Sequence, residues 1–300
     1  MVIRLFDPWR SELCTCPTKY SLNPYTGCGH ACIYCYITSY IPRAFNPRPK
    51  KNLIKSLIKE KERLDKKIFV ALSNSSDPYQ PLEKELRLTR ACLKILREFK
   101  KLIVTKSDLV VRDLDLLDNA SVSITITTLD NNIARKLEPN APSPERRLKA
   151  LEKLVSKLKV SVRVDPIIPY INDEVEELIK ELSNIGVSQV ISSTFKPRWD
   201  SWKRFEAVFP NEAKKLKEFY FKKGKRYKNA YYLPKELRFK LMKKVRKTCD
   251  KYNLSFSTCR EGFKLNTART CDGSHLIGQI PQSSSSQLLS SPIIHHSISN

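Results

Sequence analysis

Glycine, acidic side chains and long apolar runs are all scarce in this chain, and each scarcity narrows the class of protein. Seven glycines occur in 300 residues, well below the roughly 7% of an average protein, so the position of each is informative. Asp and Glu total 31 against 55 Lys and Arg, a formal net charge of +24. No uncharged apolar run reaches the roughly 18 residues that a membrane helix needs. We therefore expect no membrane partner.

The amino-terminal sequence also lacks the pattern of a secretion signal. Its first ten residues, MVIRLFDPWR, contain no long apolar stretch followed by small residues. We therefore expect a cytoplasmic protein. Thiols stay reduced there, so the nine cysteines are better interpreted as metal ligands, core residues or reactive groups than as a disulfide framework.

Residues 67–196 alternate β-branched runs with helical patterns, which is typical of strand–helix units around a parallel sheet. Strands are predicted at residues 68–73, 102–105, 122–127, 160–164 and 187–195, and a less regular sixth near residues 20–25. Helical spacing recurs between them, for example at Leu148, Leu151 and Leu154. The pattern predicts an α/β fold, specifically a partial (β/α)6 barrel rather than a closed eight-unit one.

After Phe195 the composition shifts toward Lys and aromatic residues. Residues 219–232 predict two short strands around a turn at Gly224, and residues 235–252 predict a basic helix. The end of the chain is serine-rich and uncharged, a composition that cannot offset its ordering entropy. We divide the chain into an N-terminal extension (1–18), a barrel (19–198), a basic C-terminal extension (199–278) and a tail expected to be disordered (279–300).

Three cysteines lie close together in a segment where two of the glycines occur. Residues 23–36 read NPYTGCGHACIYCY, so Cys28, Cys32 and Cys35 are separated by three and then two residues. On one tight loop, three such thiolates can reach three irons of a 4Fe-4S cluster and leave the fourth iron open to a cofactor. Gly27 and Gly29 would let the backbone curl around the cluster without a Cβ clash.

A structural zinc site is the alternative interpretation of the same loop. His30, or a thiol from Cys14 or Cys16, could complete a four-ligand set. Zinc sites usually show paired cysteines with a second pair at a distance. The loop has no such pairs, so we favour the iron–sulfur cluster.

The loop, with the aromatic Tyr34 just before its third cysteine, resembles that of the radical S-adenosylmethionine (SAM) superfamily. The resemblance implies that SAM binds the open iron and that cleavage of its sulfonium yields a 5′-deoxyadenosyl radical, which abstracts hydrogen from the substrate. It also implies an electron donor such as ferredoxin or flavodoxin.

Over residues 19–250 the chain also resembles the spore photoproduct lyase family and homologues termed DNA repair photolyases. The segments that carry this resemblance each follow a predicted strand: SNSSDPYQPLE at 73–83, VTKS at 104–107, SITITT at 123–128 with LEP at 137–139, DPIIP at 165–169 and FKP at 195–197. In barrel enzymes the loops after the strands converge over the active site. The resemblance implies the same location here.

The resemblance also implies roles for single residues. Tyr34 should line the adenine pocket, and Lys106 and Thr125 should contact the carboxylate and ribose of the cofactor. The segment from Ser75 through Ser76 to Asp77 should meet its methionine end. A lysine can pair with a carboxylate, and a hydroxyl can hydrogen-bond a ribose.

Tyr36, next to the third cysteine, corresponds to a tyrosine that relays hydrogen in the lyase, and is the expected catalytic residue. One position departs from the lyase pattern. The lyase has a cysteine three residues before the aspartate, where it returns hydrogen to the repaired thymine, and this chain has Asn74. Since an amide cannot donate a hydrogen atom as a thiol can, repair by the same relay is not expected.

Three late cysteines, Cys249, Cys259 and Cys271, are irregularly spaced. They could ligate an auxiliary cluster or, with His275, a zinc ion; alternatively Cys249 is helix core and the others are incidental. The absence of a tight pair favours the second interpretation. The two cysteines before residue 18 have no assigned role either.

Residues 214–228 hold eight Lys or Arg against one Glu, interleaved with four aromatic residues. This mixture can neutralise phosphates and stack on unpaired bases, although a Lys-rich proteome would also explain the charge. In the related lyase a hairpin here reaches damaged DNA, so the resemblance implies that Arg226 and Tyr227 contact the substrate. We predict a radical SAM enzyme, lyase-like, acting on a base of DNA or RNA flipped into the barrel. A protein or small-molecule substrate, or a non-enzymatic iron–sulfur or zinc module, are the alternatives.

Overall fold

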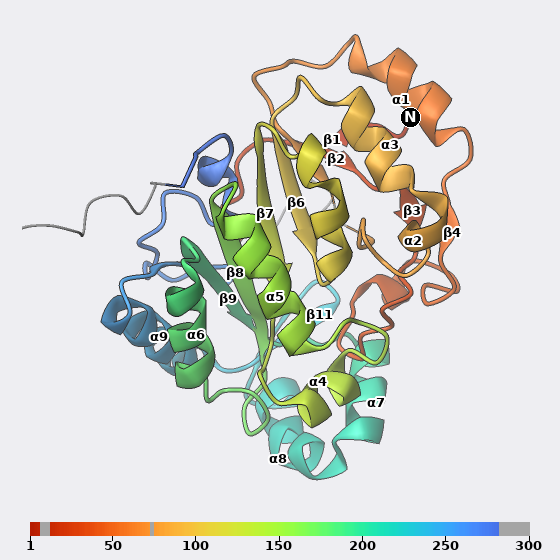
Figure 1. The fold of residues 1–300 in the computed structure, drawn as a ribbon. Coiled ribbons are helices and arrows are strands. Elements are labelled where there is room, and N and C mark those ends of the chain that lie inside the picture. Colours follow the sequence, from red (N-terminus) through yellow and green to blue (C-terminus); the bar gives the residue numbers. More distant parts are fainter. Residues whose placement is uncertain (7–12, 73–74, 282–300) are drawn as a thin grey trace, which may run out of the picture.

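The computed structural model describes residues 1–6, 13–72 and 75–281 (Figure 1). Its main sheet contains, in spatial order, β1 (Ile3–Leu5), β2 (Tyr20–Leu22), β5 (Val70–Leu72), β6 (Lys101–Thr105), β7 (Ala120–Thr125), β8 (Val160–Ile167), β9 (Gln189–Thr194) and β12 (Ser255–Thr258). All neighbours from β2 to β12 are parallel, and β1 pairs antiparallel with β2.

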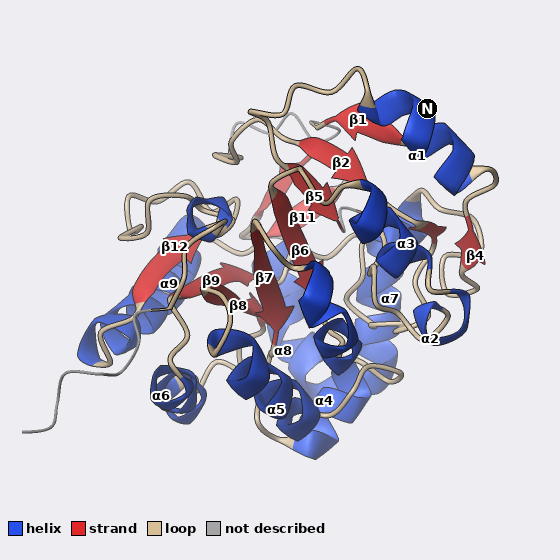
Figure 2. Cartoon of the chain, turned by 45° about the horizontal axis from the view of Figure 1, so that its top comes forward, coloured by secondary structure: helices blue, strands red, loops and turns tan. Residues whose placement is uncertain are grey.

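Helices connect the strands. They are α1 (Leu53–Lys61), α2 (Glu83–Leu86), α3 (Leu88–Ile95), α4 (Asn131–Leu137), α5 (Pro144–Val155), α6 (Glu176–Ile185), α7 (Trp199–Val208), α8 (Pro210–Phe221) and α9 (Lys235–Lys251), with 3-10 turns η1 (Ile37–Ser39), η2 (Asp108–Leu116) and η3 (Ser274–Leu276). Figure 2 shows the sheet bent into an open arc with α3, α5 and α6 on its outer side. Two small antiparallel pairs complete the fold: β3 (Tyr25–Thr26) with β4 (Arg48–Pro49), and β10 (Lys225–Tyr227) with β11 (Ala230–Tyr232).

The predicted fold is confirmed: β2, β5, β6, β7, β8 and β9 form the six units of a partial barrel, in chain order. Local sequence explains these units. All six residues of β7 are buried, as in a parallel strand covered on both faces. Helix α5 starts at the N-cap Ser143, whose side chain accepts from the Arg146 amide, with Pro144 in the first turn. Helix α6 ends at Gly186, whose φ is 94°.

The predicted strand before Gly224 was wrong. Residues 219–221 continue α8, because Tyr220 is buried against the ring of Trp202, with centroids 5.5 Å apart. This aromatic packing outweighs the β-propensity of the run. The hairpin instead turns after Tyr227, and Gly224 precedes it, where a Cβ would lie 2.2 Å from the carbonyl oxygen of Tyr232.

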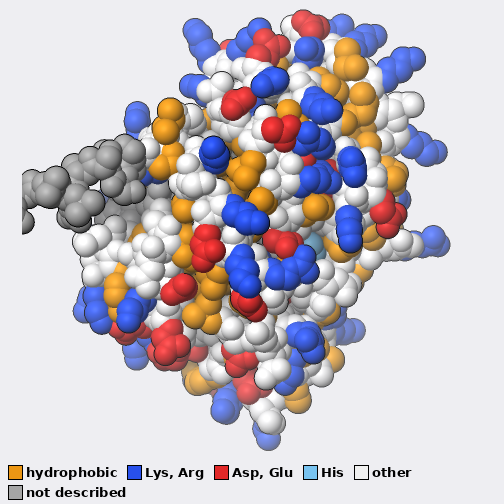
Figure 3. All heavy atoms as spheres, in the orientation of Figure 1, with side chains coloured by type: hydrophobic (Ala, Val, Ile, Leu, Met, Phe, Trp, Pro, Cys, Tyr) orange, Lys and Arg blue, Asp and Glu red, His pale blue; other side chains and the backbone are white. Residues whose placement is uncertain are grey.

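Strands β1 and β12 extend the sheet beyond the six predicted units, and the division of the chain into domains stays a prediction. Asn74 and most of the predicted tail lie outside the described residues. No described helix is long and apolar enough to cross a membrane. Figure 3 shows Lys and Arg spread over the outer face, with Asp and Glu among them near its centre.

Candidate active site

A cavity of about 360 Å³ lies at the carboxyl ends of the barrel strands. In Figure 1 these strand ends point toward α4 and α7. Each of the six barrel strands contributes lining residues at or after its carboxyl end, as the resemblance implies. Ten of the predicted site residues line this one cavity: Cys28, Cys32, Tyr34, Cys35, Tyr36, Ser75, Ser76, Asp77, Lys106 and Thr125.

The three cysteines lie on a tight loop between β3 and η1, which we call the cysteine loop (residues 27–36). Gly27 has a φ of +81°, and a Cβ there would lie 2.5 Å from the carbonyl oxygen of Ala44, so the position requires glycine. The Cys28 amide donates to that same oxygen at 2.8 Å. Gly29 differs from the expectation, because a Cβ there would make only ordinary contacts.

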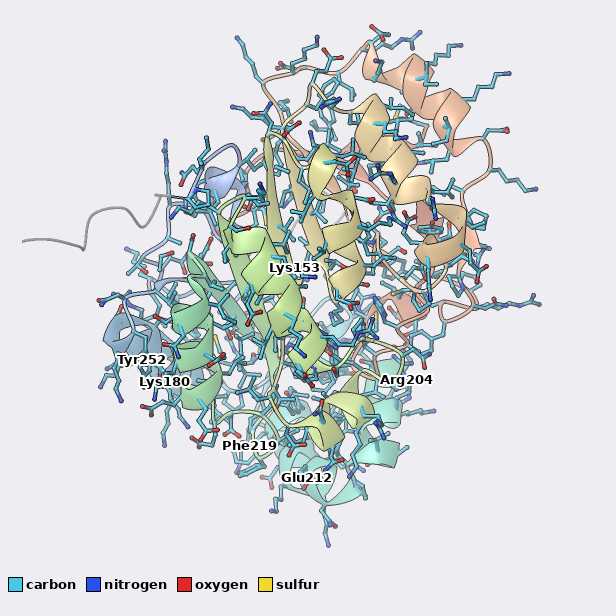
Figure 4. All side chains as sticks on the ribbon, viewed as in Figure 1. Lys153, Lys180, Arg204, Glu212, Phe219 and Tyr252 are labelled. Carbon is cyan, nitrogen blue, oxygen red and sulfur yellow. The ribbon has the colours of Figure 1, made fainter. Side chains whose placement is uncertain are left out.

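Arg204 on α7 holds the cysteine loop from outside (Figure 4). Its Nε donates to the carbonyl oxygen of Ile33 at 3.0 Å, and one Nη donates to that of Cys35 at 2.8 Å and to Thr38 Oγ1 at 2.8 Å. Its other Nη lies 3.3 Å from Asp200. A guanidinium can satisfy several acceptors at once, so one side chain fixes the backbone around two ligand positions. Sequence reasoning missed this residue.

Asp77 joins the cysteine loop to the strand ends. The buried carboxylate accepts hydrogen bonds from Thr105 Oγ1 at 2.6 Å and from the Lys106 amide at 2.7 Å, and lies 3.3 Å from Nε2 of His30. Burial alone would raise the pKa of Asp77, but His30 and the hydrogen bonds outweigh it and lower the pKa. Both oxygens of Asp77 and the ring of His30 are therefore already engaged, and His30 faces Asp77.

Tyr34, Lys106 and Thr125 are linked by a buried ion pair that sequence reasoning did not assign. Glu138 and Arg147 are each 1% exposed and lie 2.5 Å apart. The Tyr34 hydroxyl donates to Glu138, Arg147 donates to the carbonyl oxygen of Thr125 at 2.9 Å, and the Lys106 ammonium lies 5.5 Å from the Tyr34 ring centroid. The sequence contained a sign that Arg147 is buried, because this residue lies on the same face of α5 as the buried Leu151 and Leu154.

Lys106 lies among acidic side chains. Burial alone would lower the pKa of its ammonium, but Cys32, Glu138 and Asp77 outweigh burial and raise it. The group therefore stays charged at neutral pH and can pair with a carboxylate. Ser75 and Ser76 are held locally: the Ser75 amide donates to Asn23 Oδ1 at 3.1 Å and the Ser76 hydroxyl to the Gly27 carbonyl oxygen at 2.5 Å.

Tyr36 lines the cavity and is 40% exposed. Its ring stacks with that of Tyr40, with centroids 6.3 Å apart. The Arg198 guanidinium lies 5.7 Å from one ring and 5.6 Å from the other. The predicted substrate contacts Arg226 and Tyr227 lie outside the cavity lining, but their hairpin adjoins it, because Ala230 on β11 is a lining residue and the Tyr231 amide donates to the Pro197 carbonyl oxygen at 2.9 Å.

The cysteine loop fits a 4Fe-4S cluster. Its three thiols line one cavity beside the Lys106 ammonium. Burial raises the pKa of Cys28 to about 12 and that of Cys32 well above its usual range, so a bound cation is needed to keep these ligands as thiolates. Among the described His, Cys, Asp and Glu side chains, no three are already grouped so as to hold a metal ion.

Comparison with known sequences identifies the class of protein. A sequence model of the Radical SAM superfamily matches residues 22–182, more than half of the chain. The chain belongs to this superfamily, whose enzymes use a 4Fe-4S cluster and SAM as cofactors. The zinc interpretation of the cysteine loop is therefore superseded.

Two relatives show how far the similarity extends. An uncharacterised protein of Methanocaldococcus jannaschii is 39% identical over 175 residues, which are 54% of this chain and 65% of the relative. One of Acidianus two-tailed virus is 32% identical over 248 residues, 71% of this chain and 80% of the relative. The chain thus spans slightly less than two thirds of the archaeal relative.

Solved structures with this fold bind different substrates. Spore photoproduct lyase with bound AdoMet and dinucleoside spore photoproduct has a TM-score of 0.59 at 19% identity, covering 78% of this chain and 72% of the lyase chain. SuiB of Streptococcus suis bound to S-adenosylmethionine has a TM-score of 0.52 at 16% identity, covering 82% and 50%. SuiB is also known bound to its precursor peptide SuiA. At these identities the likeness concerns the fold.

Proposed function

We propose that this radical SAM enzyme acts on a base of DNA or RNA, in a lyase-like reaction. One observation carries the proposal: the cavity joins cations to aromatic rings. Arg260 lines the cavity, and within the described residues its buried Nε has no hydrogen-bond partner. Arg198 lies against the stacked rings of Tyr36 and Tyr40. A phosphate would satisfy the guanidinium and a base would stack on the rings.

The basic hairpin supports the same substrate class. Lys225 and Arg226 are exposed on it, and Lys222 and Lys223 are exposed just before it, beside the cavity that Ala230 lines. Net charge alone would not favour this proposal, because Lys and Arg also cover the outer face (Figure 3). The distinguishing feature is the position of the hairpin next to the cavity. Polyanions bind such surfaces with a strong salt dependence.

Within this proposal the residues divide by position. Cys28, Cys32 and Cys35 hold the cluster, and Tyr34, Lys106, Thr125 and the segment 75–77 hold SAM. When bound, these groups supply reductive cleavage of the sulfonium to a 5′-deoxyadenosyl radical. Tyr36, a partly exposed residue of the cavity lining, is the proposed catalytic residue. Exposed Lys and Arg suit an acidic electron donor of the ferredoxin or flavodoxin kind.

A binding measurement tests the substrate class. Fluorescence anisotropy of labelled single-stranded DNA, RNA and duplex would be recorded at several salt concentrations with the loaded enzyme. Substituting Lys222, Lys223 and Arg226 by Gln should weaken binding about tenfold or more and flatten the salt slope by about two. The matched control substitutes Lys59, which is exposed on α1, and Lys153 and Lys180, which are exposed on α5 and α6 (Figure 4). Equal losses in both triple variants, or salt-insensitive binding, would count against the proposal.

A protein or peptide substrate is the second candidate, since SuiB, with this fold, is known bound to a precursor peptide. The two candidates differ in one result. If the substrate is a peptide, the hairpin variant keeps full turnover. Detection of 5′-deoxyadenosine, first without substrate and then with polynucleotides or peptides, measures that turnover. Cofactor cleavage in any of these samples excludes a purely binding module.

A further inference from the structure

Four cysteines outside the cysteine loop meet at the same cavity. Cys14 and Cys16 precede β2, Cys259 directly follows β12, and Cys271 lies 12 residues further on. The sulfur atoms of Cys16 and Cys271 are 3.7 Å apart although the residues are 255 positions apart in the chain. We call these residues the four-thiol group. The irregular sequence spacing had suggested that the late cysteines were incidental.

The open barrel explains why they meet. The sheet ends at β1 and β2 on one edge and at β12 on the other, and the chain segments flanking those edges come together. Lys19, just before β2, and Asp272, after β12, form an ion pair of 2.8 Å and are 4% and 5% exposed. The four-thiol group therefore lies where the segments that flank the two edges of the open sheet meet.

Charged side chains line the cavity together with these thiols. Lys19, Arg163 and Lys196 are each paired with a carboxylate, that of Asp272, Asp165 and Glu261 respectively. Four thiolates around a divalent cation carry a net charge of about −2, which ammonium and guanidinium groups nearby partly offset. Because these cations are already paired, the position of the thiols, and not an excess of positive charge, points to an occupant.

We propose that Cys14, Cys16, Cys259 and Cys271 bind a second metal centre through four thiolates, as zinc or as an iron–sulfur cluster. The four thiols lose four protons to solvent when a divalent ion binds. Sulfur atoms at the corners of a tetrahedron around zinc, with bonds of about 2.3 Å, are about 3.8 Å apart. The Cys16–Cys271 distance matches that edge. The thiols are not yet grouped around one point, and the same is true of the cysteine loop.

Two other groups named in the sequence do not belong to this centre. Cys249 is fully buried in α9, as helix core. His275 Nδ1 lies 2.9 Å from Thr270 Oγ1, and the residue is not among those lining the cavity. The proposed ligand set is therefore sulfur alone. Its test does not depend on the substrate proposed above.

Metal content tests the proposal. A variant with Cys28, Cys32 and Cys35 all replaced by Ala lacks the three thiol ligands of the first cluster. This variant, purified without oxygen and loaded with iron and sulfide or with zinc, should still retain about one zinc, or about four iron and four sulfide, per chain. Elemental analysis separates zinc from iron, and acid-labile sulfide identifies a cluster.

Adding Cys16→Ser and Cys271→Ser to that background should reduce the retained metal at least tenfold. Cys249→Ala in the same background is the matched control, because it removes a buried thiol that is outside the four-thiol group, and should change nothing. If the double substitution prevents folding, as circular dichroism would show, Cys259→Ser alone replaces it. A folded background variant without metal, or metal retained after loss of Cys16 and Cys271, would overturn the proposal.

Discussion

Arg204 offers a direct test of how the fold holds the cluster. The side chain donates three hydrogen bonds to the cysteine loop and to Thr38. Hydrogen bonds from a charged donor contribute about 1.5–3 kcal/mol, but the Arg204 side chain is 26% exposed, so about 1 kcal/mol each is appropriate because water competes. Replacing Arg204 by Met should therefore destabilise the ordered loop by about 3 kcal/mol, or about 100-fold.

The assay is iron release. Loaded protein is mixed anaerobically with an excess of an iron chelator, and the release of iron is followed over time. Iron from the cysteine loop is identified as the kinetic phase that is absent when Cys28, Cys32 and Cys35 are all replaced by Ala. Arg204→Met should accelerate that phase by up to about 100-fold, and Arg204→Lys, which keeps the charge but not the planar set of donors, by less.

Arg246 provides the matched control, since it pairs with Asp250 at i+4 and donates to the carbonyl oxygen of Leu265 at 2.7 Å, far from the cysteine loop in sequence. Arg246→Met should leave iron release unchanged. Release from Arg204→Met within about threefold of the unsubstituted protein would refute the reasoning, because the loop would then be ordered without the guanidinium.

Two further predictions concern charged groups at the cavity. Lys106→Gln removes the ammonium beside Tyr34 and should weaken SAM binding about 10- to 100-fold in equilibrium dialysis of the loaded enzyme; Lys153→Gln should not, and equal affinity of both would contradict the assignment. Glu138→Gln leaves the buried charge of Arg147 unpaired and should lower the free energy of unfolding in urea by about 3–5 kcal/mol. Glu145→Gln breaks an exposed pair with Lys149 and should leave the free energy of unfolding almost unchanged, because water screens exposed ion pairs; equal losses in the two variants would argue against a buried pair.

Local patterns predicted much of this protein. Buried parallel strands have nearly continuous apolar sequences, so five of the strands could be predicted. The cysteine loop could also be predicted, because its three cysteines are near neighbours in the sequence. Strands β1 and β12 were not predicted, because three or four residues such as SFST carry too short a pattern. The run before Gly224 was misread because aromatic residues suit both a strand and a buried helix face, and only tertiary packing against Trp202 decides between them.

The contacts that position the site could not be predicted in the same way. Arg204 reaches a carbonyl oxygen 171 positions earlier in the chain, and Cys16 meets Cys271 across 255 positions. The curvature of the whole sheet brings such partners together, and a local sequence pattern does not predict it. Arg147 is intermediate: a charge on the apolar face of α5 signals a buried partner, although it does not say that the partner is Glu138.

The buried and half-buried ion pairs near the strand ends bear on function. Arg147 pairs with Glu138, Arg163 with Asp165 and Lys196 with Glu261, in each case near a strand end. Desolvation makes such pairs poor sources of stability, and apolar packing would often serve a fold as well. Apolar side chains packed at the strand ends would also fill the space that the cavity occupies. Charged pairs instead keep the strand ends polar and fixed in place. This arrangement suits a cavity that must accept an anionic cluster and a charged cofactor without reorganising.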